Sequence, residues 1–443
     1  MKRGNRDVEV ISRRFKPYPA YKDSGVEWLG EIPAHWEVRR LKRVCTFAYG
    51  DSLASDTRMD GDIEVYGSNG PVGAHEVANT VAPCLVLGRK GSFGKVNFSA
   101  RPVFAIDTTF FVDQRFSRAD IRWLYYVLTN ARLDSATKDS AIPGLDREDA
   151  YARDVCWCLP HEQRAIASFL DRETAKIDAL VEKKERLIEL LQEKRTALIT
   201  RAVTKGLDPN VPMKDSGVEW LGEIPAHWEV KRLKHVLKVQ KGAVKTGPFG
   251  SQLQSSEMLS GDIKVYNQRN VIDGDFTSGE NYITYDKFRE LSAFETFPGD
   301  LLITTRGSIG RCAILPERAE QGILHPCLMR VQSDRQKILP CFLEIEIQDC
   351  GIVVEQLRLM SNATTIDVIY SESLKEVWLV LPPINEQKAI LAFIDRESAQ
   401  SDALKAKNQE LIYRLKEYRT ALISAAVTGK IDVRDHVTVD PEK

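Results

Sequence analysis

The sequence lacks the features that would place the chain in a membrane or in an oxidising compartment. No run of 18 apolar residues occurs, which excludes a membrane-spanning helix. The charged start, MKRGNRDVEVISRRF, has no apolar core, so no signal peptide is expected. The eight cysteines are scattered, and the close pair Cys156 and Cys158 lacks the C-x-x-C spacing of zinc and redox sites. We therefore expect reduced thiols, no bound metal and a cytoplasmic location.

Motifs for catalysis are also missing. GRKGSFGKV has five residues between Gly88 and Gly94 where a P-loop requires four, and Val96 replaces the hydroxyl residue that would bind magnesium. Neither H-E-x-x-H nor a G-x-S-x-G elbow occurs. We find no NPPY-like loop for methylating an exocyclic amine and no convincing glycine-rich loop for adenosylmethionine. We therefore expect no catalytic centre and no cofactor on this chain.

A large charge of one sign is absent too. The formal net charge is −1 over 443 residues, which argues against an indiscriminate polyanion binder and leaves room for a local basic patch. The length exceeds what one compact core usually holds, so two or more domains are expected.

What the sequence does contain is a long internal repeat. The 17 residues KDSGVEWLGEIPAHWEV occur at Lys22–Val38 and, without a single difference, at Lys214–Val230. A second matched pair of charged segments runs over residues 162–208 and 386–432. Each copy thus consists of an identical passage, a variable region and a charged segment. Such a period is too long for a solenoid and indicates a duplicated two-part unit.

The charged segments have the pattern of long helices. The positions of a seam recur at alternating intervals of three and four, with the polar residues Lys184, Lys194 and Asn408 among them, and glycine and proline are absent until Gly206 and Gly429. The predicted seam consists of Ile177, Leu180, Leu187, Leu191 and Leu198, matched by Leu404, Leu411, Leu415, Tyr418 and Leu422. We expect the two helices to pack on each other, since either alone would leave an apolar stripe in water; the alternative is a coiled coil that serves only dimerisation. Residues 162–200 would be about 58 Å long at about 1.5 Å per residue, the length of roughly seventeen base pairs at about 3.4 Å each.

The variable regions share anchor points but differ at their tips. GDIEVYGSNG at Gly61 matches GDIKVYNQRN at Gly261, and LGRKGSFGKV at Leu87 matches TTRGSIGRC at Thr304. Short strands with glycine turns and an occasional helix predict two strand-rich α/β domains. Asn, Gln and Arg at the tips suit base edges, and cations beside glycines suit phosphates. The alternatives are tight turns, solvated lysines and, for Tyr66 and Tyr266, core aromatics.

These motifs together resemble the specificity subunit of type I restriction–modification systems. The resemblance rests on the repeated passage, GPFGSQL, GDLLITTRGSIG, LPPINEQKAIL, FIDRE and the heptad helices, and covers roughly Tyr21 to Asp432. It implies an α+β fold with two target-recognition domains in pseudo-twofold arrangement, joined by the two long helices packed as an antiparallel coiled coil. Each domain would read one half of a split, asymmetric DNA target. The helices would set the gap and dock two adenine methyltransferase subunits, and motor-nuclease subunits would join for restriction. S-adenosylmethionine, ATP and magnesium would belong to those partners.

The resemblance also places domains and recognition residues. We expect an N-terminal segment (1–21), recognition domain 1 (22–160), a central helix (161–201), a linker (202–213), recognition domain 2 (214–384), a distal helix (385–427) and a tail (428–443). The candidate DNA-binding residues are Tyr66, Ser68, Asn69, Arg89, Lys90, Ser92, Lys95, Lys245, Thr246, Tyr266, Gln268, Arg269, Asn270, Arg306, Ser308 and Arg311.

The identical passages would be structural, each an entry turn and strand that seats a domain on the helices through Trp28, Pro33 and Trp36 and their copies Trp220, Pro225 and Trp228. Trp36 and Trp228 are expected to be core anchors. Because the passages are the same in both copies, they cannot distinguish one half-site from the other. The rival interpretation is a coiled-coil scaffold that presents two protein-binding domains and reads no DNA. Its best support is the nearly neutral net charge.

Overall fold

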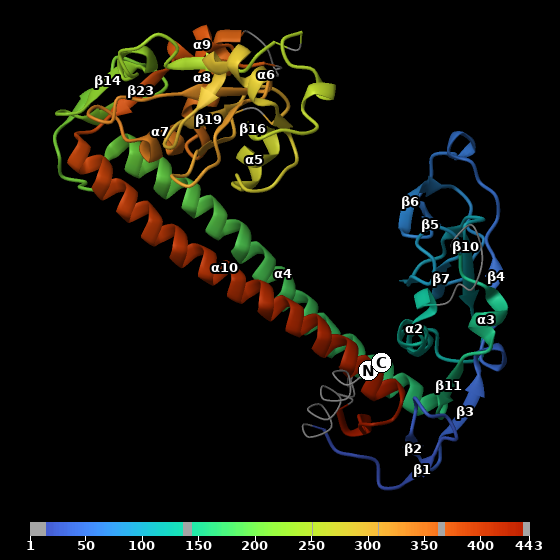
Figure 1. Ribbon diagram of the computed structural model, residues 1–443. Coiled ribbons are helices and arrows are strands. Elements are labelled where there is room, and N and C mark those ends of the chain that lie inside the picture. Colours follow the sequence, from blue (N-terminus) through green and yellow to red (C-terminus); the bar gives the residue numbers. More distant parts are fainter. Residues whose placement is uncertain (1–14, 136–143, 250, 309, 362–367, 437–443) are drawn as a thin grey trace. The chain divides into compact units, whose positions relative to one another are not determined.

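The chain forms two compact units, each built around one globular domain. The computed structural model describes residues 15–135, 144–249, 251–308, 310–361 and 368–436. Unit 1 comprises Met1–Arg186 and Asn408–Lys443, and unit 2 comprises Leu187–Lys407. Both contain segments of the two long helices α4 (Pro160–Lys205) and α10 (Ile384–Val427) (Figure 1). Within the described ranges, no helix combines the length and the apolar character needed to cross a membrane.

Domain 1, the globular part of unit 1, consists mainly of two small sheets. One has the strand order β4-β10-β7-β8, and the other has the order β6-β5-β9 with β5 and β9 parallel. Strands β7 and β10 are buried along their whole length, as expected for the apolar runs CLVLG and TFFVD. The elements are β1 (Tyr21–Asp23), β2 (Glu31–Pro33), β3 (Glu37–Arg40), β4 (Ala48–Tyr49), β5 (Ile63–Gly67), β6 (Gly70–His75), β7 (Cys84–Gly88), β8 (Val96–Ser99), β9 (Phe104–Ala105), β10 (Thr109–Asp113), α2 (Ile121–Asn130), α3 (Arg147–Tyr151) and β11 (Asp154–Trp157).

Domain 2, the globular part of unit 2, has the same plan with additions. Its first sheet has the order β15-β22-β19-β20, and its second has the order β17-β16-β21-β18 with β16 and β21 parallel. The elements are β12 (Met213–Asp215), β13 (Glu223–Pro225), β14 (Glu229–Arg232), β15 (Val244–Thr246), β16 (Ile263–Tyr266), α5 (Gln268–Asp273), β17 (Tyr282–Ile283), α6 (Tyr285–Glu290), β18 (Glu295–Thr296), β19 (Leu301–Thr304), β20 (Cys312–Ile314), β21 (Gly322–Leu324), β22 (Leu328–Val331), α7 (Pro340–Gln348), α8 (Ile352–Ser361), α9 (Ser371–Lys375) and β23 (Trp378–Leu381).

The duplication seen in the sequence therefore extends to the strand topology. In chain order, β4, β7, β8 and β10 of domain 1 take the sheet positions of β15, β19, β20 and β22 of domain 2. The antiparallel pair β3–β11 likewise corresponds to β14–β23. The two copies differ after the matched strands β5 and β16, since β5 turns directly into β6 whereas β16 leads into helix α5. The α+β fold with strand-rich domains is confirmed, and the exact domain boundaries stay a prediction.

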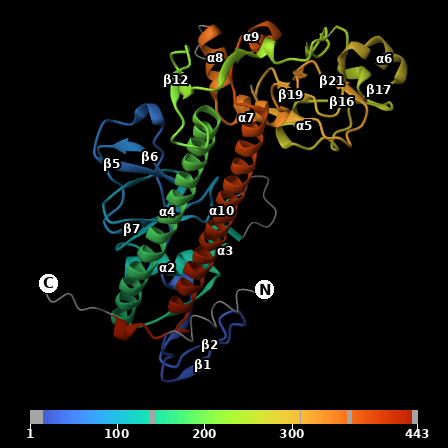
Figure 2. The same cartoon turned by 90° about the vertical axis from the view of Figure 1, so that its left-hand side faces the viewer.

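Helices α4 and α10 pair in antiparallel fashion within each unit. In unit 1, Asp178 Oδ1 in the first half of α4 lies 2.9 Å from Arg419 Nε in the last half of α10, and Lys416 Nζ lies 3.3 Å from Glu185 Oε1. In unit 2, Arg195 Nε near the end of α4 donates to Ser398 Oγ near the start of α10, at 3.2 Å. The antiparallel pairing of the helices (Figure 2) is therefore confirmed.

Of the ten residues predicted for the seam, six are buried or half-buried and four are exposed. Ile177 and Leu422 are buried, and Leu191, Leu198, Leu415 and Tyr418 are half-buried. Leu180, Leu187, Leu404 and Leu411 are exposed instead, with Leu404 keeping 50% of its accessible surface. On both helices, the residue that follows an exposed leucine packs in the seam instead: Val181 follows Leu180, Ile412 follows Leu411, and both are buried. The two-helix pair thus leaves a series of leucines in solvent.

Each identical passage packs where one long helix begins and the other ends. Trp36 is fully buried, and the side chain of His35 lies 2.9 Å from Glu162 Oε1 in the first turn of α4. Just past the end of α10, Gly429 lies against Trp36 and Pro33. The second copy repeats this seat with Trp228, with His227 2.7 Å from Glu386 of α10, and with Gly206 beyond the end of α4. Burial confirms Trp36 and Trp228 as core anchors.

Candidate nucleic-acid interface

In domain 1, the β5–β6 turn and the glycine loop meet at one backbone oxygen. Ser68 Oγ donates to the carbonyl oxygen of Thr108 at 2.7 Å. The backbone N–H groups of Arg89 and Lys90 donate to the same oxygen at 2.9 and 3.2 Å. The structure therefore brings together three candidates from two segments, and it adds the loop before β10.

Cationic side chains surround this junction. Lys95 Nζ donates to both the backbone oxygen and the side-chain oxygen of Asn69, each at 2.8 Å. The guanidinium groups of Arg89 and Arg147 both lie 5.3 Å from the ring centroid of Tyr49, which is half-exposed. Such stacking orients a guanidinium without neutralising its charge. Arg147 and Tyr49 were not among the candidates from the sequence, because both lie outside the matched motifs.

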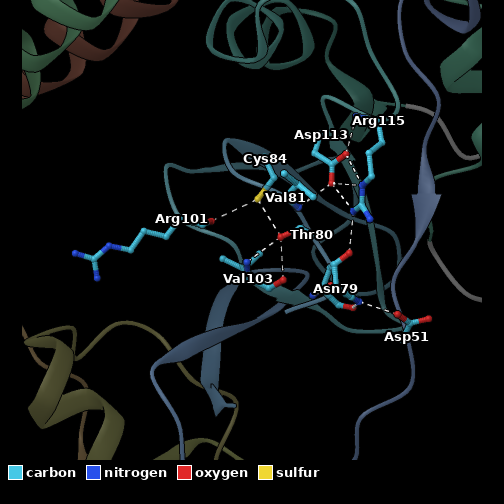
Figure 3. A network of polar contacts seen from close by, with 10 residues as sticks. Asp51, Asn79, Thr80, Val81, Cys84, Arg101, Val103, Asp113 and Arg115 are labelled. Atoms are coloured by element: carbon cyan, nitrogen blue, oxygen red, sulfur yellow. Dashed lines mark hydrogen bonds and ion pairs between the residues drawn. The ribbon is translucent and has the colours of Figure 1, made fainter. Parts of the chain in front are cut away.

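A polar network fixes the two sheets of domain 1 to each other (Figure 3). Thr80 Oγ1 accepts from the N–H of Val103 at 2.8 Å, next to β9, and Asp113 of β10 accepts from the N–H of Val81 at 2.9 Å. Burial alone would raise the pKa of Asp113, but hydrogen bonds from Arg115 and Val81 hold that pKa below its usual value. The β5–β6 turn is thereby held on a rigid support.

In domain 2, the corresponding tip is the start of helix α5. Asn267 is the N-cap, and its side-chain oxygen accepts from the N–H of Arg269 at 2.9 Å. Asn270 Oδ1 in turn accepts a hydrogen bond from the N–H of Asn267 at 3.0 Å, and these reciprocal bonds form a capping box. Asn270 is buried, and its amide nitrogen donates to the carbonyl oxygens of Asp275 and Ser278.

The remaining tip residues of domain 2 are accessible. The side chain of Arg269 keeps 87% of its accessible surface and lies 3.2 Å from Asp273. Gln268 donates to the backbone oxygen of Arg306, so the tip and the glycine loop meet here as they do in domain 1. Arg306, Ser308 and Arg311 are exposed, as are Lys90, Ser92 and Lys95 in domain 1. Lys245 and Thr246 lie on β15, where Lys245 Nζ lies 4.7 Å from the ring centroid of Phe294.

Three candidates have structural roles in the domain cores. Tyr266 is fully buried, and its hydroxyl donates to the carbonyl oxygen of Glu320 at 2.7 Å. Burial and the charge of Glu320 raise its pKa to about 12. Tyr66 packs in the core of domain 1 with Val86 and Phe111, and Asn270 is occupied by the capping box. We therefore remove Tyr66, Tyr266 and Asn270 from the residues expected to touch DNA, while the other contacts stay predictions.

The described residues include no group of three or more His, Cys, Asp or Glu side chains that could hold a metal ion. All eight cysteines are free thiols. Burial raises the pKa of Cys156 to about 12, so this thiol stays protonated at neutral pH.

Comparisons with known proteins agree on one family. A model of the type I restriction modification DNA specificity domain matches residues 225–413. The type I restriction enzyme EcoBI specificity subunit of Escherichia coli is 20% identical over 354 residues, which cover 78% of this chain and 73% of that protein. The MjaVIII specificity subunit of Methanocaldococcus jannaschii is 25% identical over 333 residues, covering 73% of each. A solved structure described as the basis of complex assembly and conformational transition of the type I R-M system has the same fold, with a TM-score of 0.60 and 16% identity over 89% of this chain and 98% of that one.

Proposed function

Because the chain belongs to the family of type I restriction–modification specificity subunits, we propose that it selects the DNA sequence for such a complex and performs no catalysis itself. Each globular domain reads one half of a bipartite, asymmetric DNA target. The paired helices set the distance between the halves and dock two adenine methyltransferase subunits. Motor-nuclease subunits complete the complex for restriction. The chemistry, with its S-adenosylmethionine, ATP and magnesium, belongs to those partners.

The observation that carries this proposal is one scaffold with two different tips. Both domains place a four-stranded sheet of the same strand order beside a parallel strand pair. At the matched point, domain 1 presents a hairpin turn with Asn69 and Lys95, and domain 2 presents a helix start with Gln268 and Arg269. Asn, Gln and Arg pair with base edges in the major groove. Two different tips on one scaffold are what an asymmetric, two-part target requires.

The exposed leucines of the long helices support the docking of partner helices. Leu180 and Leu187 on α4 are seven residues apart, as are Leu404 and Leu411 on α10, so each pair lies on one face of its helix. An apolar row left in water favours burial against another apolar surface. A methyltransferase subunit that contributes a helix would cover these rows.

The proposal is tested by the methylation pattern of cells. We expect a split adenine-methylation motif when the methyltransferase subunit is made together with this chain, and none without this chain. Replacing Arg269 by alanine should relax the motif in one half only, by about 1–3 kcal/mol of discrimination if a bidentate base contact is lost. Long-read methylation sequencing measures both halves at once.

Arg289→Ala is the matched control for Arg269→Ala. Arg289 also lies on a short helix of domain 2, is exposed, and pairs with an aspartate, Asp286 at 3.9 Å. It should leave the motif unchanged. Equal relaxation of both half-sites by Arg269→Ala would contradict the assignment of one half-site to each domain, and the absence of any motif from cells that make both proteins would contradict the proposed function.

A further inference from the structure

The identical passages have an exposed surface that seating the domains does not explain. Their buried residues have an evident role, because Leu29, Ile32, Pro33 and Trp36 pack inside unit 1 just as Leu221, Ile224, Pro225 and Trp228 pack inside unit 2. His35 and His227 are exposed and contact the long helices, but the exposed residues Glu27 and Trp28, with their counterparts Glu219 and Trp220, have no such packing role. They are nevertheless identical in both copies, and each has the same exposure class as its counterpart.

Duplication alone does not account for this identity. On the long helices, exposed residues at matching positions have diverged, as Glu182 has from Ala406 and Arg186 has from Glu410. The variable regions differ even more. The exposed residues of the passages are therefore identical while other exposed residues of the repeat have diverged. This difference indicates a contact that both copies make in the same way.

The central feature of this surface is an exposed tryptophan on a well-fixed loop. Trp28 keeps 58% of its accessible surface and Trp220 keeps 42%. We call residues 22–33 and 214–225 the tryptophan loops. In the first loop, the N–H of Ser24 donates to the oxygen of Gly30, and the N–H of Leu29 donates to the oxygen of Val26, both at 3.0 Å. The second loop repeats these bonds at 3.0 and 2.9 Å, from Ser216 to Gly222 and from Leu221 to Val218.

A large apolar ring held in water on a preformed loop is suited to protein binding. Tryptophan is among the residues that contribute most to protein interfaces. Because the loop is already ordered by its own hydrogen bonds, little further conformational entropy is lost when a partner covers the ring.

The charge around each ring indicates the chemistry of the partner. In the first loop, the exposed charged residues are Asp23, Glu27 and Glu31 against a single cation, Lys22. The second loop has the same balance, with Asp215, Glu219 and Glu223 against Lys214. Lys430 donates to the backbone oxygens of Leu29 and Glu31, and Lys205 donates to that of Glu223, so each loop keeps a small excess of negative charge. Such a surface does not favour the phosphates of DNA. It complements an apolar hollow rimmed by lysine or arginine on a protein.

We propose that the two tryptophan loops are equivalent docking sites for two copies of one protein. Trp28 of the first loop and Trp220 of the second each insert into an apolar pocket with a basic rim on the bound copy. Two identical surfaces on one chain bind two copies of the same partner. This inference rests on the proposed function, from which the partner is the methyltransferase subunit. It adds a contact outside the long helices and assigns one loop to each bound copy.

The test counts methyltransferase subunits bound to the full-length chain by native mass spectrometry, with affinities from titration. Wild type should bind two. Trp28→Ala and Trp220→Ala should each weaken one of the two sites roughly 30-fold or more, which is the loss expected when a tryptophan is a hot spot of its interface, and the double variant should weaken both. Leu259→Ala is the matched control, since Leu259 is an exposed apolar residue of domain 2 outside the loops, with 76% of its surface accessible.

A second pair of variants separates docking from folding. Glu27→Lys and Glu219→Lys remove no apolar surface and reverse a charge at an exposed position, so they should also weaken one site each while circular dichroism stays unchanged. Retention of both sites at wild-type affinity in the double tryptophan variant would overturn the proposal and leave the proposed function intact. Loss of DNA binding with two subunits still bound would assign the loops to DNA and overturn it as well. If wild type bound no methyltransferase subunit, the proposed function and this inference would fall together.

Discussion

Gly429, just past the end of α10, is the position where one added methyl group should most disturb the seat of unit 1. Its φ of +72° lies in the left-handed region, which costs a residue with a side chain about 1–2 kcal/mol. A Cβ at this position would lie 2.3 Å from Pro33 Cδ, 2.6 Å from Pro33 Cγ and 3.0 Å from the Trp36 ring. Overpacking of this kind costs about 1–3 kcal/mol. Gly429→Ala should therefore lower the free energy of unfolding of unit 1 by about 2–5 kcal/mol.

Two other glycines separate the backbone effect from the steric effect. Gly25 has a φ of +71°, but a Cβ at this position would have no atom within 4 Å, so Gly25→Ala should show the backbone cost alone. At Gly206, with a φ of +76°, the nearest atom is a Trp228 ring carbon at 3.1 Å, so Gly206→Ala should be intermediate. Urea unfolding followed by tryptophan fluorescence gives the free energies, and hydrogen exchange shows which unit has opened. If Gly429→Ala and Gly25→Ala destabilised the chain equally, the close packing of Gly429 on Pro33 and Trp36 would be refuted.

Two further predictions concern the helix seam and a buried carboxyl group. Val181→Asn should lower the melting temperature of unit 1, because it places an amide in the buried seam at a cost of about 1–3 kcal/mol. Leu180→Asn, one residue away and 42% exposed, should change the melting temperature little. A larger decrease for Leu180→Asn than for Val181→Asn would support the seam predicted from the sequence. Glu346 is buried and accepts a hydrogen bond from the N–H of Val380 at 2.8 Å, and burial raises its pKa well above the usual value. The native state then holds a proton that the unfolded state releases above about pH 4.3, so the stability of unit 2 should fall as pH rises from there towards the raised pKa. Glu346→Gln should flatten this dependence and stabilise unit 2 at pH 8, and parallel unfolding curves for the two proteins between pH 5 and 8 would contradict the raised pKa.

The sequence predicted the repeat and the long helices, because each depends on a regular pattern, and the family resemblance implied their antiparallel pairing. It missed the phase of the seam for a physical reason. Apolar residues stand next to each other at Leu180 and Val181, and again at Leu411 and Ile412. The residues three and four positions after the preceding seam residue are therefore both apolar, and either could continue the seam. Only packing on the partner helix determines which one is buried.

The recognition tips were predicted as segments but not as individual contacts. The identity of Asn270 suggested a base contact, yet its side chain is used to cap α5 and to hold the backbone that follows. A capping box is recognisable only once a helix is expected there, and the short run after Tyr266 gave no helical periodicity. The contact of Gln268 with Arg306 joins segments that only the tertiary fold brings together.

The antiparallel helices explain why the seats of the two domains can be identical. In unit 1, the passage contacts the start of α4 through His35 and Glu162 and the end of α10 through Trp36 and Gly429. In unit 2, the roles of the helices are exchanged: Trp228 donates to Glu386 at the start of α10, and Gly206 at the end of α4 lies against its ring. Two parallel helices would pair start with start and end with end, and no junction of this mixed kind could form. Because each junction combines one start and one end, one seat sequence serves both, and the variable regions are free to diverge without changing how a domain is held.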